Sequence, residues 1–412
     1  MSRSFPAGFL WGAAAAGHQI EGNNSNSDTW FAEHVTPTVF KEPSGLACDS
    51  YNRWEEDLDL IRAMNLNTYR FSVEWARIEP TEGTFSEAEL DHYEAIIDGA
   101  KARGFKTVVT LNHFTSPHWF AAKAGWLNPA APELFARFTR KVIERFGDRI
   151  DYVITFNEPD LMAMLKHHNL PAFVQQLSDA TVEACSKAAG VERYRLANVM
   201  RLDDIEDYAV GMERGHIAAR QVIRELRPNL PLGISVAVTD DQVVPGADPA
   251  LRDAKRAEVY ERWLRLAADD DFCAVQNYER EVYDGAGKVE IPADANRNFL
   301  SAEIYPPSLA GAVRYVHEFT GKPILITEHG LSTNDDSDRA KFIPAALSHL
   351  LDAIEDGVPV IGYIHWSFLD NFEWIFGYEP KFGLVSVDRS TMERTRKPSS
   401  FVYQEIATNN AL

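Results

Sequence analysis

Eight short apolar runs alternate with amphipathic stretches along this 412-residue chain, and that alternation restricts its fold more than any other feature. Several of the runs are almost continuously hydrophobic, as parallel strands covered on both faces are. Eight strand–helix repeats predict an α/β fold, a single-domain (β/α)₈ barrel over residues 1–412 with elaborated loops after its strands. The predicted strands are residues 9–15, 68–75, 106–113, 152–158, 232–238, 272–278, 323–328 and 360–368.

The stretches between the runs carry the marks of helices. Ser86, with Glu89 three residues later, forms a capping box for one of them. Another pattern, over 338–356, stops at Gly357, and glycine is favoured just past a helix C-terminus. An open doubly wound sheet is the alternative fold. It is disfavoured because no GxGxxG-type phosphate loop follows a predicted strand.

Two stretches are less regular than the rest. Residues 160–207 are predicted to form an elaborated, partly helical loop after the fourth strand, and residues 279–303 a similar loop after the sixth. Long loops at this end of a barrel shape substrate pockets.

Composition disfavours several classes of function. The chain has 41 Lys and Arg against 61 Asp and Glu, a net charge of −20, so nucleic acid and anionic membranes are not expected partners. No stretch reaches the ~18 apolar residues of a membrane span, and the N-terminus lacks the pattern of a signal peptide. Three widely spaced cysteines predict neither disulfides nor a metal site. We therefore expect a cytoplasmic protein without metal or cofactor, and the oligomeric state stays open.

Two glutamates follow predicted strands that lie far apart in the sequence. Glu158 lies in TFNEP (155–159) and Glu328 in ITEHG (326–330). Barrel enzymes place their active sites at the C-terminal ends of the strands, so both carboxyl groups are expected in one pocket. Such a pair suits cleavage of a glycosidic bond, in which one carboxyl protonates the leaving oxygen and one carboxylate attacks the sugar.

Almost every predicted strand ends in polar or aromatic residues after an apolar body, which favours a catalytic rim. The first strand leads to Gln19, the second contains Arg70, and the third, fourth, sixth and eighth end with His113, Asn157, Tyr278 and Trp366.

An ordered set of motifs then connects the chain to a family. FLWGAAAAGHQIEG, YRFSVEWARIEP, TLNHFTSPHWF, TFNEP, ITEHG and WSFLDNFEWIFGYEPKFGLVSVD occur in that order. Together they resemble glycoside hydrolase family 1, the β-glucosidases and their relatives, over nearly the full length. The resemblance implies a retaining β-glycosidase with a barrel fold and no metal, acting on a small-molecule or oligosaccharide β-glycoside.

The resemblance also implies roles for single residues. Glu158 matches the acid/base and Glu328 the nucleophile, with carboxyls about 5–5.5 Å apart. Arg70 and Tyr278 would support the nucleophile. The DNFEW string implies a non-phosphorylated sugar such as glucose, galactose or fucose. The substrate-binding residues implied are Gln19, His113, Asn157, Trp366, Glu373 and Trp374.

The chain departs from the family's motifs in four places. His329 replaces Asn in ITENG, Gln276 takes the place of Asn in INYYT (here VQNYE), and Phe114 replaces Trp in HWDLP. Residues 160–200 lack the usual Gly- and Pro-containing run. These departures leave the preference for the sugar and the aglycone open.

Two other functions stay open at this point. A transglycosylase would use the same two glutamates and pass the glycosyl group to an alcohol. A non-catalytic sugar-binding barrel is disfavoured because both glutamates are present.

Overall fold

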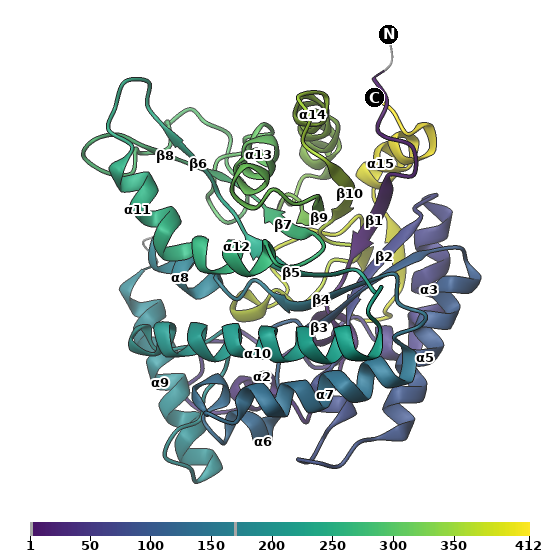
Figure 1. Ribbon diagram of the computed structural model, residues 1–412, viewed down its shortest axis with the longest axis vertical. Helices are drawn as coiled ribbons and strands as arrows, with labels where there is room; N and C mark the ends of the chain where they lie inside the picture. Colours follow the sequence, from purple (N-terminus) through teal and green to yellow (C-terminus); the bar gives the residue numbers. More distant parts are fainter. Residues whose placement is uncertain (1–2, 169–170) are drawn as a thin grey trace.

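The computed structural model describes residues 3–168 and 171–412 and contains a closed barrel of parallel strands (Figure 1). The strand order around the barrel is β1-β10-β9-β7-β5-β4-β3-β2. The eight predicted strands and the predicted barrel are therefore confirmed. The strands are β1 (Leu10–Ala14), β2 (Thr68–Ser72), β3 (Lys106–Asn112), β4 (Tyr152–Asn157), β5 (Leu232–Ala237), β7 (Cys273–Asn277), β9 (Ile324–His329) and β10 (Val360–His365).

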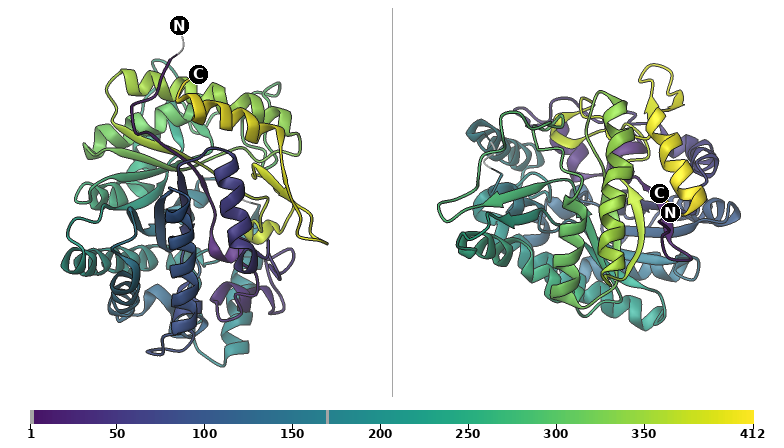
Figure 2. Two further views of the ribbon diagram at one scale, coloured as in Figure 1. Left: turned by 90° about the vertical axis from the view of Figure 1, so that its right-hand side faces the viewer. Right: turned by 90° about the horizontal axis from the view of Figure 1, so that it is seen from above.

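Long helices surround the barrel (Figures 1 and 2). The Ser86 side chain accepts from the N–H of Glu89, as the predicted capping box requires, but the N–H of Ser86 donates to the carbonyl of Ile78 and not to Glu89, so only the N-cap half of the box is formed. The helix predicted over 338–356 is observed as α14 and ends just before Gly357, whose φ is +100°. The main helices are α3 (Ser50–Ala63), α5 (Glu87–Ala102), α7 (Ala131–Phe146), α10 (Ile205–Leu226), α11 (Ala250–Val259), α12 (Glu261–Ala267), α13 (Ser308–Thr320), α14 (Asp336–Glu355) and α15 (Pro398–Asn409).

Further elements lie in the connections between the barrel strands and these helices. The helices are α1 (Gly17–Ile20), α2 (Asp28–Glu33), α4 (Trp75–Ile78), α6 (His118–Ala121), α8 (Leu161–Lys166) and α9 (Ala172–Ala189), with 3₁₀ turns η1 (Gly125–Leu127), η2 (Leu202–Asp204) and η3 (Trp374–Phe376). The remaining strands are β6 (Asp240–Val243), β8 (Arg280–Tyr283), β11 (Val385–Val387) and β12 (Arg394–Arg396).

The barrel strands bury apolar side chains on both faces, which explains why their sequences are almost continuously hydrophobic. One face packs against the helices in the largest core cluster; Val109, Val153, Val275 and Ile326 belong to it. The other face fills the barrel, where residues from strands on opposite sides contact one another. That interior cluster includes Leu10, Val108, Ile154, Ala274, Leu325 and Ile364.

The stretch 160–207 contains α8, α9 and η2, so its partly helical character is confirmed; residues 169 and 170 within it lie outside the described residues. The stretch 279–303 differs from the prediction, because it opens with the strand β8. β8 pairs in parallel with β6, so the two continue β5 and β7 beyond the barrel as a short ribbon beside α11 (Figure 1). Charged residues dominate this ribbon, and they left no apolar run in the sequence to predict it.

The described chain ends meet on one side of the barrel (Figure 2). The N–H of Leu412 donates to the carbonyl of Arg3 at 3.0 Å, and Ser4 pairs with Ala411. Within residues 3–168 and 171–412, no helix is both long and apolar enough to cross a membrane.

Candidate active site

Bulges interrupt the two strands from which the catalytic candidates emerge. On β4, Ile154 pairs with Gly233 and Asn157 with Ser235, so β4 carries one residue more than its neighbour. On β9, the partner of Val275 is Ile326 but that of Gln276 is Glu328. A bulge breaks the strict in–out alternation of a strand and redirects the side chains that follow it.

Glu158 adds a second irregularity. Its φ is +42°, a left-handed conformation that a non-glycine residue rarely adopts. Such a conformation costs on the order of 1–3 kcal/mol and persists where surrounding structure holds it. Here the N–H of Glu158 donates to the carbonyl of Ser235 at 3.0 Å. The backbone turn and the bulge together bring the adjacent residues Asn157 and Glu158 to the same site.

Glu328 is held through both of its carboxylate oxygens. Arg70 donates to Oε1 and the Tyr278 hydroxyl donates to Oε2, each at 2.5 Å. Burial raises the pKa of Glu328, and the charge and hydrogen bond of Arg70 and the bond from Tyr278 oppose that rise. Donors on both oxygens favour the ionised form of this carboxyl.

Glu158 has a different environment. Its side chain is 9 % exposed, and in the part of the chain that the structure describes no hydrogen bond or ion pair reaches its carboxyl. Burial, followed by the negative charges of Glu328 and Asp160, raises the pKa of Glu158 well above its usual range. Two carboxyls whose surroundings differ in this way can take the roles of acid and base.

Arg70 links its own strand, β2, to β3, β4 and β9. It is fully buried, and besides Glu328 it donates to Oδ1 of Asn157 at 2.5 Å and to the carbonyl of Thr327 at 3.1 Å. Nε2 of Gln276 donates to the same Asn157 oxygen at 2.7 Å. The structure thus places Gln276, known from the sequence only as a departure from a motif, in the centre of the site.

The predicted substrate-binding aromatic residues stack on one another. His113 lies nearly parallel to Trp366, with ring centroids 5.6 Å apart, and nearly parallel to Trp374 at 6.1 Å. Phe114 meets Trp374 edge-on at 5.3 Å. Burial, with a contribution from the charge of Arg70, lowers the pKa of His113 well below its usual range, so its imidazole is neutral.

Gln19 and Glu373 are the polar residues predicted to bind the sugar beside these aromatic side chains. Nε2 of Gln19 donates to the carbonyl of Phe372 at 2.8 Å and lies 3.4 Å from Oε2 of Glu373. Burial, together with the charge of Glu328, raises the pKa of Glu373 to about 8. The predicted residues thus form two contact groups, Arg70, Asn157, Tyr278 and Glu328 around the nucleophile, and Gln19, His113, Trp366, Glu373 and Trp374 with the aromatic residues. The charge of Glu328 acts on the pKa values of both Glu158 and Glu373.

The sequence analysis missed His18. Its ring stacks on Trp374 with an interplanar angle of 5° and a centroid distance of 5.8 Å, and its Nε2 lies 2.8 Å from Oε1 of Glu33. Its position directly before Gln19 in GHQIEG was the available signal.

His329, which the sequence analysis singled out as a departure from the family motif, lies away from the site. Its Nδ1 pairs with the Tyr363 hydroxyl at 2.9 Å and its ring stacks on Phe342 of α14. This departure from the motif faces the helix layer rather than the nucleophile.

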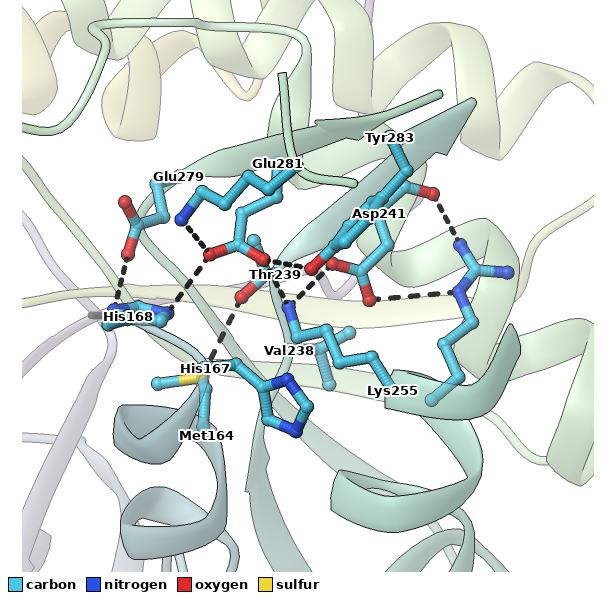
Figure 3. A network of polar contacts seen from close by, with 12 residues as sticks. Met164, His167, His168, Val238, Thr239, Asp241, Lys255, Glu279, Glu281 and Tyr283 are labelled. Atoms are coloured by element: carbon cyan, nitrogen blue, oxygen red, sulfur yellow. Dashed lines mark hydrogen bonds and ion pairs between the residues drawn. The ribbon is translucent and has the colours of Figure 1, made fainter. Parts of the chain in front are cut away.

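A second group of charges lies at the rim, on the ribbon that continues β5 and β7. Lys255 of α11 lies between Asp241 of β6 and Glu281 of β8, with Nζ–O distances of 2.6 and 2.8 Å (Figure 3). The three side chains are almost fully buried. We refer to Asp241, Lys255 and Glu281 as the rim ionic cluster. It fixes the ribbon to α11, and Tyr278 lies two residues before β8 begins at Arg280.

No group of three or more His, Cys, Asp or Glu side chains within residues 3–168 and 171–412 is placed to hold a metal ion.

The site therefore consists of two buried carboxyls at the ends of β4 and β9, one of them held by Arg70 and Tyr278. The family model described as glycosyl hydrolase family 1 matches residues 1–183 and 266–412. The chain belongs to this family. It is a glycoside hydrolase.

Similar proteins of this family align with the entire chain. Beta-glucosidase A of Thermotoga maritima is 31 % identical over 100 % of this chain and 99 % of its own length. A beta-glucosidase of Agrobacterium sp. is 32 % identical over 99 % of this chain and 96 % of its own. Among solved structures, the beta-glycosidase BGL167 is 41 % identical with a TM-score of 0.92, and covers 99 % of this chain and 98 % of its own.

The Thermotoga maritima beta-glucosidase has also been solved in complex with deoxynojirimycin. That structure is 29 % identical to this glycoside hydrolase, with a TM-score of 0.84 and full coverage of both chains. The family model leaves residues 184–265 unmatched. This segment includes Asp241 and Lys255, so two of the three members of the rim ionic cluster lie outside the family's common pattern.

Proposed function

We propose that this glycoside hydrolase is a retaining β-glycosidase. It hydrolyses terminal, non-phosphorylated β-D-glucosyl residues, with galactosyl and fucosyl residues as alternatives, through a covalent glycosyl–enzyme intermediate. One observation carries the proposal: the carboxyl of Glu328 has donors on both oxygens, which oppose the rise of its pKa, whereas in the described chain no hydrogen bond reaches the carboxyl of Glu158 and its pKa rises well above the usual range. The first is suited to attack and the second to proton donation.

In the first step, the Glu328 carboxylate attacks the sugar at C1 while Glu158 gives its proton to the glycosidic oxygen, and the aglycone leaves as an alcohol. Arg70 and Tyr278 position the nucleophile and favour its charged form before attack. The geometry required is a carboxyl separation of about 5–5.5 Å.

In the second step, Glu158 acts as a base. Once Glu328 is esterified, its negative charge is gone, and one cause of the raised pKa of Glu158 disappears with it. The Glu158 carboxylate then takes a proton from water, the water oxygen attacks C1, and Glu328 departs as a carboxylate. Two inversions leave the sugar with its original configuration.

The remaining residues are proposed to hold the sugar. Asn157 would donate to the 2-hydroxyl, Gln19, His113 and Glu373 would bind the other hydroxyls, and Trp366 and Trp374 would stack or donate. Glu373 supports a non-phosphorylated sugar, because a phosphate placed there would meet acidic groups rather than a cation.

The proposal extends to partners and location. The ligand is a small-molecule or oligosaccharide β-glycoside, and neither nucleic acid nor a membrane takes part. A cytoplasmic location is supported by the three buried free cysteines and by a human relative called cytosolic beta-glucosidase, which is 29 % identical over 99 % of this chain.

A panel of aryl β-glycosides that differ only in the sugar tests this function. We expect measurable turnover with the glucoside, and proton NMR should detect the β-anomer as the first product. Initial release of the α-anomer would contradict the retaining mechanism. In the same assay, the ratio of free sugar to released aglycone measures transfer to an alcohol rather than to water.

A further inference from the structure

The turn at Glu158 takes its carbonyl out of the hydrogen-bond ladder between β4 and β5. The N–H of Glu158 donates to the carbonyl of Ser235 on β5 at 3.0 Å. In a regular parallel ladder, the carbonyl of the same residue would accept from the N–H two positions further along β5, which is that of Ala237. With Glu158 at a φ of +42°, its carbonyl accepts instead from the N–H of Leu161 at 3.1 Å, at the start of α8.

The carboxyl of Asp160 takes the place of that carbonyl. Its Oδ1 accepts from the N–H of Ala237 at 3.2 Å. Asp160 stands at the N-cap of α8, where aspartate ordinarily accepts from an N–H of its own helix, but its side chain makes no such bond. Asp160 and Ala237 are only 1 % and 3 % exposed, so water is not at hand to satisfy this N–H. One buried side chain thus closes the gap that the turn at Glu158 opens in the ladder.

The contact between Asp160 and Ala237 bears on where Glu158 points. A buried backbone N–H without an acceptor is unfavourable, and the acceptor that a regular ladder offers to Ala237 is the carbonyl of Glu158. To return to the ladder, Glu158 must leave its left-handed conformation. In a strand conformation its side chain would lie on the face opposite to that of Asn157, away from the site. Supplying Ala237 with another acceptor therefore removes the competition for the Glu158 carbonyl.

We propose that Asp160 is a positioning residue for the acid/base, and that its hydrogen bond with Ala237 keeps Glu158 in the turn that brings its carboxyl into the site. The hydrogen bond, and not the charge of Asp160, performs this role. The designation of Glu158 as acid/base rests on the proposed function, whereas the conformation of Glu158 does not.

The charge of Asp160 can be separated from its hydrogen bond. After burial and the charge of Glu328, this charge is a further cause of the raised pKa of Glu158. Burial in turn raises the pKa of Asp160 to about 8, opposed by the hydrogen bond from Ala237 and the charge of Lys255. At pH 6 the Asp160 carboxyl is therefore mainly neutral. Asparagine reproduces the shape of the neutral carboxyl and its acceptor, without the charge.

The test compares, at pH 6, a β-glucoside with a poor leaving group, phenol, and one with a very good leaving group, dinitrophenol. Only the first needs a proton from Glu158. For Asp160→Ala we expect kcat/KM to fall about 10–100-fold on the phenyl glucoside and less than about threefold on the dinitrophenyl glucoside. Asp160→Asn keeps the acceptor and should stay within about threefold of the wild type on both.

Asp151→Ala provides the matched control. Asp151 directly precedes β4, and its Oδ2 accepts from the N–H of Thr107 on the neighbouring strand β3 at 2.9 Å. Because this contact lies at the opposite end of β4, its loss should leave the ratio of the two substrates unchanged. The ratio within one variant does not depend on the folded fraction, so a destabilised variant still gives an answer. Equal losses on both substrates in Asp160→Ala, or the same selective loss in Asp160→Asn, would overturn the inference.

A crystal structure of Asp160→Ala separates this inference from the proposed function. We expect φ of Glu158 to become negative and its carbonyl to accept from Ala237. A Glu158 that keeps its positive φ would overturn the positioning role even if the wild type hydrolyses glucosides. If Glu158→Ala instead lost activity equally on both glucosides, the assignment of the acid would fail, and the change of conformation in Asp160→Ala would still be expected.

Discussion

Glu281 of the rim ionic cluster and Glu158 of the active site are both buried carboxyls, yet they differ in how many donors reach them. At the rim, Glu281 accepts from Lys255 and Tyr283 (Figure 3). It also accepts from Lys288. Burial acts to raise the pKa of Glu281, but these partners outweigh it and hold the pKa at about 2. In the active site, burial dominates, and the pKa of Glu158 rises well above its usual range.

The difference shows how one fold separates stability from reactivity. A buried carboxylate whose donors are all supplied by the protein contributes to stability and has no capacity left for a ligand. Within residues 3–168 and 171–412 no hydrogen bond reaches the Glu158 carboxyl, whose pKa is raised by burial, and a substrate can supply that partner. The following experiments test this comparison, beginning with the largest expected effect.

Replacing the nucleophile should have the largest effect. Glu328→Ala removes the attacking carboxylate, and we expect kcat to fall by about 10⁴-fold or more. Added azide should restore cleavage of an activated aryl glycoside and give a product of inverted configuration, because azide attacks C1 from the vacated side. NMR of the product checks this outcome. Rescue with retained configuration would mean that another group is the nucleophile.

Replacing the acid/base should have an effect that depends on the leaving group. For Glu158→Ala we expect a loss of about 10²–10⁴-fold on a glycoside with a poor leaving group. Substrates with very good leaving groups need no protonation, so the first step on them should be nearly unchanged. Pre-steady-state release of the aglycone measures that step.

The pH profile provides the control for this assignment. In the wild type, kcat/KM should decline on the alkaline side as Glu158 loses its proton, and on the acid side as Glu328 gains one. Glu158→Ala should lose the alkaline decline with good leaving groups. If the decline persists in the variant, it belongs to another residue.

The rim ionic cluster should affect stability instead of chemistry. Lys255→Met removes the buried cation that Asp241 and Glu281 share, while Lys288 stays with Glu281. We expect the free energy of unfolding to fall by about 3–5 kcal/mol. Activity per folded molecule on a simple aryl glycoside should fall far less than in either glutamate variant. Urea unfolding and active-site titration measure the two quantities. Loss of activity without loss of stability would contradict the distinction between the two centres.

The contribution of Glu281 to the free energy of unfolding should depend on pH. Its pKa drops from 4.5 in the unfolded chain to about 2 in the folded protein, so its ionised form stabilises the fold by about 3 kcal/mol above pH 4.5. Because the folded pKa is the lower one, this stability is lost as the pH falls through about 2. The difference in unfolding free energy between wild type and Glu281→Gln should therefore shrink from pH 5 toward pH 2. A difference independent of pH would show that the Glu281 charge is not its source.

The smallest effect is expected at an exposed ion pair. Lys166 and Glu258 are 2.7 Å apart, but their side chains are 52 % and 43 % exposed. Lys166→Met removes a lysine charge just as Lys255→Met does, but at a position exposed to water. We expect a change in unfolding free energy of at most about 1 kcal/mol. A larger loss would show that proximity, rather than burial, determines the contribution of these pairs.

The alternation of apolar runs and amphipathic stretches was sufficient to predict the barrel, because strands buried on both faces leave continuous hydrophobic runs. The sites of both glutamates were also predictable, since the C-terminal ends of barrel strands converge. The β6–β8 ribbon was not, because Asp241 and Glu281 look like solvated charges until their partner Lys255 is known. Ion pairs between distant segments leave no periodic pattern in a sequence.

By itself, then, the sequence determined the barrel and the pair Glu158 and Glu328, through hydrophobic periodicity and the residues that end each strand. Only the tertiary structure decided which partners these residues have. The bulges in β4 and β9 shift the register by one residue, bring Gln276 opposite Glu328 and turn His329 toward α14. A one-residue shift reverses the face of a side chain, so the identity of a neighbour across strands follows from the folded register and not from the order of residues.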